Sequence, residues 1–218
     1  LMIRKNILEG VYSTEEINQM SYKIQEEDLY LIATSEHPLI GMFINKTIPL
    51  KQLPIKITGY SMCFRKEIGS HGIDEKGLYR THQFNKQEMI VICRPEDSYK
   101  YYAELLKLSK ELFKKLKIPI RELESCSGDL ADLKAKGADL EAWSPRQNKY
   151  FEITSVTNME EAQARRLNIK FTNEKNDRRF VHTLNNTAIA TSRALVAILE
   201  NYQQKDGSIK IPSVLQKY

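Results

Sequence analysis

The chain has 218 residues, of which 41% are hydrophobic, so it can bury a substantial core, and extensive disorder is excluded. Its 33 basic and 28 acidic residues give a formal net charge of +5, which fits an ordinary protein surface as well as a polyanionic partner. No apolar run approaches the ~18 residues of a membrane helix and no signal peptide is visible, while the cysteines form no C-x-x-C pair, so we predict a cytoplasmic protein without a disulfide framework or zinc ribbon.

The first predicted elements are strands. Residues 28–34 indicate a short buried strand that enters a turn at 35–38. Two longer strand candidates, 55–66 and 79–93, are rich in β-branched and aromatic residues. The polar segment 68–77 between them contains three glycines. We therefore predict a long antiparallel hairpin whose loop is too large for a tight turn.

The next elements mix one long helix with more strands. Residues 96–117 predict an amphipathic helix, because leucine and aromatic residues recur there at helical spacing. Strand candidates follow at 119–125, 137–143 and 148–156, and a short helix at about 159–167. Strands and helices do not alternate regularly, which predicts an α+β fold with a mostly antiparallel sheet rather than a doubly wound parallel one.

The last predicted helix begins after a cap at Asn185 or Asn186. From Ala188 to Leu199 it is apolar on nearly every face, which predicts burial from several sides, and Arg193 is the single full charge in that run. A buried guanidinium without a partner is costly. Arg193 is therefore expected to pair either with an acidic side chain of the fold or with a phosphate group of a ligand.

Polar side chains of the predicted hairpin converge on one face. Arg65 and Glu67 share a face of the first strand, because side chains alternate with a period of two. Arg80, Phe84 and Glu88 share a face of the second strand by the same count. Guanidinium groups suit phosphates and an aromatic ring can stack on a purine, so this face is a candidate nucleotide site. The alternative is a solvated face with cross-strand salt bridges.

A second candidate feature is the pair Glu152 and Ser155. A carboxylate close to a hydroxyl suits Mg²⁺, which prefers hard oxygen ligands and shares them with phosphate. In an ideal strand the two side chains would face opposite sides, so this interpretation requires a bulge or a turn. No P-loop and no strand-linked G-x-G-x-x-G occurs, so an ATP site would have to be built on the sheet.

Three segments resemble the motifs of one enzyme family. The segment 64–67, followed by a loop, by 80–84 and by Glu88, resembles motif 2 of the class II aminoacyl-tRNA synthetases. The segment 185–193, which runs on into LENYQ, resembles motif 3. The triplet 34–36, Thr-Ser-Glu, resembles the T-x-E element of the seryl-tRNA synthetase family in particular. The motifs occur in the family's order, and the match covers the chain roughly from residue 27 to its end.

The resemblance implies an antiparallel sheet of about six strands flanked by helices, with residues 28–218 as the catalytic domain and 1–27 as an N-terminal remnant leading into it. The implied ATP-binding residues are Arg65 on the α-phosphate, Glu67 on the adenine amino group, Arg80 near the phosphates, Phe84 stacked on the adenine, Glu152 and Ser155 on Mg²⁺, and Arg193 on the γ-phosphate, with Arg65 and Arg193 catalytic. The implied serine-binding residues are Thr34 and Glu36 for the amino group, and Glu88 and Thr187 for the hydroxyl.

The resemblance also implies what the protein acts on. It implies ATP-dependent activation of L-serine to seryl-adenylate with Mg²⁺, transfer to tRNA(Ser), and a homodimeric full-length enzyme. The family's N-terminal tRNA-binding arm and its motif 1, which builds the dimer, have no counterpart in residues 1–27. We therefore expect a portion of a synthetase that forms the adenylate at most, and we expect tRNA charging and dimerisation to need the other parts.

Three alternatives remain open. Relatives without the tRNA arm load amino acids onto carrier proteins and use a zinc site with cysteine ligands. A non-catalytic paralogue of a synthetase would bind ligands without reacting. A basic RNA-binding protein would fit the net charge, although no RNA-binding motif is visible.

Overall fold

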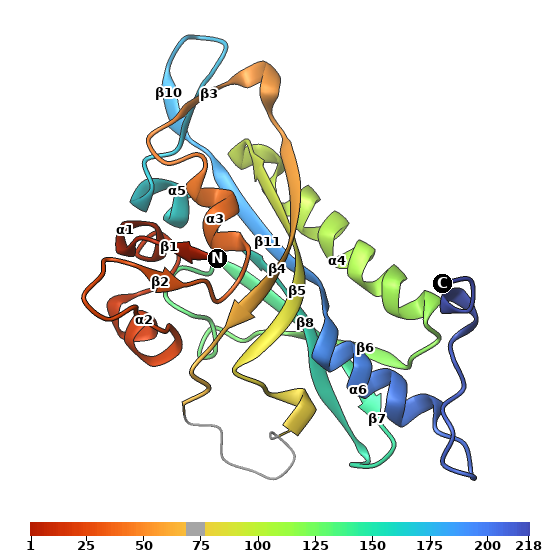
Figure 1. Cartoon of the computed structure of the whole chain (residues 1–218). Coiled ribbons are helices and arrows are strands. Elements are labelled where there is room, and N and C mark those ends of the chain that lie inside the picture. The colour runs from red at the N-terminus through yellow and green to blue at the C-terminus, as the bar shows by residue number, and fades with distance from the viewer. Residues whose placement is uncertain (69–76) are drawn as a thin grey trace.

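The computed structural model describes residues 1–68 and 77–218, so residues 69–76 of the predicted loop lie outside the described residues. The described part of the chain contains a six-stranded sheet in the order β4-β5-β11-β8-β7-β6, and every neighbouring pair is antiparallel (Figure 1). This confirms the predicted α+β class. The strands are β4 (Ile55–Phe64), β5 (Gln83–Cys93), β6 (Ile120–Glu124), β7 (Lys136–Ser144), β8 (Lys149–Asn158) and β11 (His182–Ala190).

The main core lies between this sheet and two helices, α4 (Ser98–Lys115) and α6 (Thr191–Tyr202). On α4, Tyr102, Leu105 and Phe113 are buried against the sheet at helical spacing, as the sequence pattern predicts. Ala194 and Ala197 of α6 join the same cluster. This core fixes the middle of the sheet, from which the polar site described below is built.

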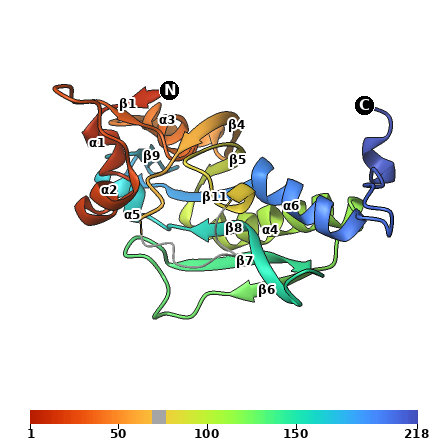
Figure 2. The same ribbon diagram turned by 60° about the horizontal axis from the view of Figure 1, so that its bottom comes forward.

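A second layer covers the other end of the sheet. There α3 (Glu36–Gly41) and α5 (Ala162–Arg166) pack with the small sheet of β3 (Thr47–Pro49), β9 (Lys170–Thr172) and β10 (Arg178–Phe180). The N-terminal elements are β1 (Met2–Ile3), α1 (Lys5–Leu8), α2 (Thr14–Met20) and β2 (Tyr30–Leu31), and they share a further small core. Figure 2 shows α1 and α2 at one end of the molecule and α6 with the C-terminus at the other.

The predicted hairpin is confirmed. Strands β4 and β5 pair along their length, from Ile55 opposite Ile92 to Phe64 opposite Gln83. The first strand ends two residues earlier than predicted, and the second begins at Gln83 because Gly77–Tyr79 form a turn of 3-10 helix. The predicted strand 28–34 is correct only for Tyr30–Leu31, since the following residues turn into α3.

The prediction for the last helix is wrong at its start. Residues 185–190 belong to β11, and α6 begins at Thr191. The physical reason is that β11 is an inner strand, paired with β5 along most of its length and with β8 near its middle, and that layers on both sides of the sheet bury residues of both its faces, so its sequence lacks the polar alternation of a half-exposed strand. The predicted burial of α6 from several sides is only partial, because Leu195 and Leu199 are 44% and 37% exposed.

No helix built by residues 1–68 and 77–218 is both long enough and apolar enough to cross a membrane. The cysteines are free, with Cys63 and Cys93 buried and Cys126 exposed.

Candidate active site

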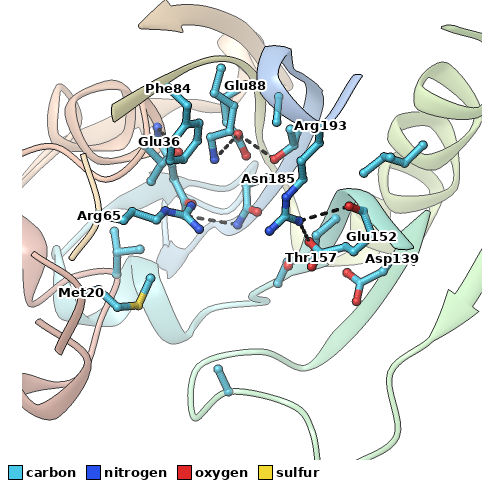
Figure 3. A pocket seen from close by; sticks show the side chains of 18 of the residues that line it. Met20, Glu36, Arg65, Phe84, Glu88, Asp139, Glu152, Thr157, Asn185 and Arg193 are labelled. Carbon is cyan, nitrogen blue, oxygen red and sulfur yellow. Dashed lines mark hydrogen bonds and ion pairs between the residues drawn. The ribbon is translucent and has the colours of Figure 1, made fainter. Parts of the chain in front are cut away.

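A cleft of about 390 Å³ opens where the ends of β4, β5, β8 and β11 meet α2, α3 and α6 (Figure 3). Every site residue expected from the sequence lines it. These residues are Thr34, Glu36, Arg65, Glu67, Arg80, Phe84, Glu88, Glu152, Ser155, Thr187 and Arg193. Segments that are far apart in the sequence therefore meet in one cavity, which we call the central cleft.

Arg65 forms one side of the central cleft together with Phe84. Arg65 follows the last residue of β4, and its Nε donates a hydrogen bond to the carbonyl of Ala33 at 3.3 Å. Its guanidinium carbon lies 5.4 Å from the centre of the Phe84 ring, within the range of a cation–π contact (Figure 3). The arginine is therefore held over an aromatic face, and among the described residues its other N–H groups make no hydrogen bond, so they can meet a ligand anion.

Glu67 and Arg80 stand on either side of residues 69–76 in the sequence and meet in space. The Arg80 Nη1 atom lies 2.5 Å from the Glu67 carboxylate. Glu67 lies beyond the strand and has a positive φ of 52°, a conformation uncommon outside glycine. Strand alternation is thus the wrong reason for its position: the turn of the backbone after Phe64, and not a shared strand face, brings Glu67 to the cleft.

Arg193 approaches the central cleft from the first turn of α6. It forms an ion pair of 3.0 Å with Glu152 on β8 (Figure 3). Its guanidinium carbon lies 4.7 Å from the centre of the Tyr79 ring. The expected acidic partner is therefore present. Because Arg193 also lines the cavity, its guanidinium can exchange part of this pairing for a ligand phosphate.

Glu152 and Ser155 face the same cavity because the sheet is irregular there. The register between β7 and β8 shifts, so that Leu140 is opposite Thr154 while Glu141 is opposite Glu152. This is the bulge that the sequence interpretation required. Asp139, which no sequence motif marked, lies opposite Ser155 and also lines the cleft. Burial, and next the charge of Glu152, raise the pKa of Asp139.

This donor set suits Mg²⁺ in one particular way. Within the described ranges no group of three or more histidine, cysteine or acidic side chains is arranged to hold a metal alone. Glu152 and Ser155, with the nearby Asp139, offer hard oxygen atoms on one wall of the cleft. Mg²⁺ commonly uses one or two carboxylates and takes its remaining ligands from phosphates and water. The residues therefore fit an ion that arrives with a phosphate ligand.

The deepest wall of the cleft holds a network of charged and amide groups, which we call the buried carboxylate cluster. Its members are Glu36, Lys86, Glu88, Gln163, Asn185 and Thr187. Glu88 is 2% exposed, pairs with Lys86 at 2.7 Å, and accepts a hydrogen bond of 3.1 Å from the Thr187 hydroxyl. This wall provides two carboxylates but a single lysine.

Glu36 is the second carboxylate of this cluster. Its Oε1 atom accepts hydrogen bonds from Gln163 at 3.0 Å and from Asn185 at 3.1 Å. Burial, and next the nearby charge of Glu88, raise the pKa of Glu36 from 4.5 to about 7. One additional cation would balance the cluster, so this wall favours a ligand with a positive group.

Three members of the cluster were not predicted from the sequence. Lys86 could have been found, because it is two residues from Glu88 on the same strand face. Asn185 was expected as a possible helix cap and as the first residue of the motif 3 segment, without a binding role, and no local signal marks Gln163. Two histidines make contacts of a structural kind: His82 Nδ1 lies 2.7 Å from the Tyr22 hydroxyl, and the buried His37 ring packs edge-on against Tyr12 at 4.9 Å.

Comparison with known proteins adds a family to this geometry. The family model described as "tRNA synthetase class II core domain (G, H, P, S and T)" matches residues 14–202. The serine–tRNA ligases of Pyrococcus horikoshii and Methanospirillum hungatei are 50% and 49% identical to the chain over its whole length. The chain spans about half the length of these curated relatives, 48% and 52% respectively.

Solved structures give the same result. The structure of seryl-tRNA synthetase from Pyrococcus horikoshii complexed with ATP matches with a TM-score of 0.97 at 50% identity and covers 100% of this chain and 49% of that one. Cytoplasmic serine–tRNA ligase from Naegleria fowleri in complex with AMP matches with a TM-score of 0.92 at 39% identity, over 100% and 52%. The similarity thus includes the sheet and every element around the central cleft.

Proposed function

This chain belongs to the class II tRNA synthetase core-domain family, and from that premise we propose that it activates L-serine with ATP, forming seryl-adenylate and pyrophosphate. The observation that carries the proposal is the central cleft itself. It combines arginines at its mouth with the buried carboxylate cluster at its base. A triphosphate requires the first and a small zwitterion with an ammonium group requires the second.

The arginines of the cleft indicate where ATP would bind. Arg65 would bind the α-phosphate, with Phe84 as the stacking surface for the adenine, since the two side chains already lie in contact range. Arg193 would bind the γ-phosphate and Arg80 would lie near the phosphates, with Glu67 on the adenine amino group. Bidentate guanidinium groups match phosphate oxygens in shape as well as in charge.

The buried carboxylate cluster indicates where the amino acid would bind. Thr34 and Glu36 would bind the serine ammonium group, and Glu88 with Thr187 would bind the hydroxyl. The existing hydrogen bond between Thr187 and Glu88 supports this, because a hydroxyl already donates to the Glu88 carboxylate at this place. A binding site that hydrogen-bonds a ligand hydroxyl rejects a ligand without one, because the polar groups of the site are then left unpaired.

The reaction follows from this placement. The serine carboxylate attacks the α-phosphorus, the bond from that phosphorus to the bridging oxygen breaks, and pyrophosphate leaves with the electron pair. A carboxylate is already ionised at neutral pH, so the step needs no general base. Arg65 and Arg193 would align the reactants and balance the negative charge on the phosphates.

We assign Mg²⁺ to Glu152 and Ser155, because these oxygen atoms fit an ion shared with phosphates. When bound, the ion supplies positive charge to the phosphate oxygens. Glu152 has a second task, since it holds Arg193 at the cleft through their ion pair.

The same premise places the chain in a larger enzyme. The named relatives are about twice as long, so we propose that charging of tRNA(Ser) and formation of a homodimer involve the other half of such a protein. We further propose that it acts in the cytoplasm, where its free cysteines would stay reduced.

Serine-dependent exchange between ATP and labelled pyrophosphate tests the proposal. Exchange should occur with serine and fall at least about a hundredfold with alanine. Equal exchange with both amino acids would contradict the role of Glu88 and Thr187. Binding of ATP without any exchange would instead support a non-catalytic paralogue.

The carrier-protein alternative is less well supported. Its zinc site requires cysteine ligands, but none of Cys63, Cys93 and Cys126 lines the cleft. Stoichiometric zinc in the purified protein would favour that alternative over ours.

A further inference from the structure

Helix α5 brings one side chain into the buried carboxylate cluster from outside the main sheet. Gln163 lies on this helix, between β8 and β9, and is 2% exposed. Its Nε2 atom donates a hydrogen bond of 3.0 Å to Oε1 of Glu36, which is 127 residues away in the sequence. In Figure 1 this helix lies beside α3, the helix that begins with Glu36.

Two amides hold the same oxygen of Glu36. The Asn185 Nδ2 atom donates to Oε1 at 3.1 Å, so it converges with Gln163 on one atom. The backbone N–H of Glu36 also donates to the Thr34 hydroxyl at 3.2 Å. Among the described residues no hydrogen bond reaches Oε2, so the carboxylate is fixed through one oxygen and offers the other to the cleft.

Helix α5, which carries Gln163, is hydrogen-bonded to a segment that lines the cleft. Arg166 donates two hydrogen bonds of 3.1 Å, to the carbonyls of Glu9 and Tyr12. Tyr12 lines the central cleft, and Ala164 on the inner side of the helix is fully buried. Gln163 therefore reaches Glu36 from a rigid support rather than from a loop.

We propose that Gln163 is a positioning residue for amino-acid binding, which orients the Glu36 carboxylate and keeps it ionised for the substrate ammonium group. The proposal rests on the proposed function and extends it to a residue that does not line the cleft.

The charges around Glu36 explain why such support is needed. Burial and the neighbouring Glu88 favour the neutral acid, whereas the Gln163 hydrogen bond, Lys86 and Lys134 favour the carboxylate. Tyr12 also lies within electrostatic range of Glu36, and its hydroxyl stays neutral because burial raises its pKa. Removing the amide donor should therefore raise the pKa of Glu36 further and weaken its hold on a cation.

The test is Gln163→Met, which keeps the length of the side chain and removes the donor. The matched control is Gln87→Met. Gln87 lies on β5 and does not line the cleft. Steady-state exchange should be measured from about pH 6 to about pH 9, with serine and ATP varied separately.

Near pH 7.5 we expect the KM for serine to rise about tenfold in Gln163→Met, as expected for one hydrogen bond to a charged group, while the KM for ATP stays within about twofold. Serine binding should weaken on acidification, as Glu36 becomes protonated. The pH at which this happens should be higher in the variant, because the amide donor no longer favours the ionised form of Glu36. Gln87→Met should behave as the unmodified protein. An unchanged KM for serine, or an unchanged pH profile with a lower melting temperature, would overturn the proposal and leave Gln163 a purely structural residue.

A second variant covers the case in which Gln163→Met does not fold. Gln163→Glu keeps the shape but places a further carboxyl group beside Glu36, in addition to Glu88, so the KM for serine should rise more than in Gln163→Met, again with the KM for ATP unchanged. Equal KM values in Gln163→Glu and the unmodified protein would overturn the proposal. Absence of exchange in the unmodified protein is a different result, because it would reject the proposed function, and this role with it.

Discussion

Replacing Glu36 with glutamine should stabilise the fold at alkaline pH while it removes activity. Burial and Glu88 raise the pKa of Glu36 from 4.5 to about 7, so the folded protein binds this proton more tightly than the unfolded chain. The stability that results is fully present below about pH 4.5 and is lost as the pH rises through about 7. At pH 8 the ionised group costs the folded state about 3 kcal/mol.

Glutamine avoids this cost because it is neutral at every pH. Its carbonyl oxygen can still accept the hydrogen bonds from Gln163 and Asn185, so the cluster keeps its geometry. We therefore expect the Glu36→Gln variant to match the unmodified protein near pH 4.5 and to exceed its free energy of unfolding by up to about 3 kcal/mol near pH 8.

Urea unfolding at several pH values, followed by circular dichroism, measures the difference. The control is Glu122→Gln, which changes an exposed glutamate paired with Lys110 and should leave the curve parallel to that of the unmodified protein. Parallel curves for Glu36→Gln as well would refute the reasoning, because they would show that Glu36 is ionised at no cost. In the exchange assay Glu36→Gln should lose most serine-dependent activity, since a neutral amide does not balance an ammonium group.

Three further outcomes follow from the site and the core. Arg65→Ala should lower exchange by about a hundredfold or more without changing the circular dichroism, whereas Arg179→Ala, which removes an exposed ion pair, should leave exchange intact. Thr187→Val should raise the KM for serine about tenfold and leave the KM for ATP unchanged, because Glu88 loses its hydroxyl donor. Phe113→Ala should lower the free energy of unfolding by about 3–5 kcal/mol in urea, since this ring is fully buried; a smaller loss would show that the core collapses around the gap.

The sequence pointed to many of the residues that line the candidate site. Side-chain alternation placed Phe84 and Glu88 on one strand face. Arg193 was marked because it is the single full charge in an otherwise apolar run. The family motifs then supplied the other predicted members of the site. These signals are local in the chain, which is why the hairpin and the polar residues of the cleft could be predicted from the order of the amino acids alone.

The tertiary structure decided what depends on neighbours far away in the chain. Residues 185–190 form a strand because β5 pairs along this segment while β8 pairs with Asn185 and Asn186 on the other side, and no local pattern encodes those partners. The irregular register between β7 and β8 turns Glu152 toward the cleft. Gln163 and Asn185 reach Glu36 across 127 and 149 residues. Hydrogen bonds between such distant groups are set by packing in three dimensions, whereas sequence periodicity reports only the face that each element buries.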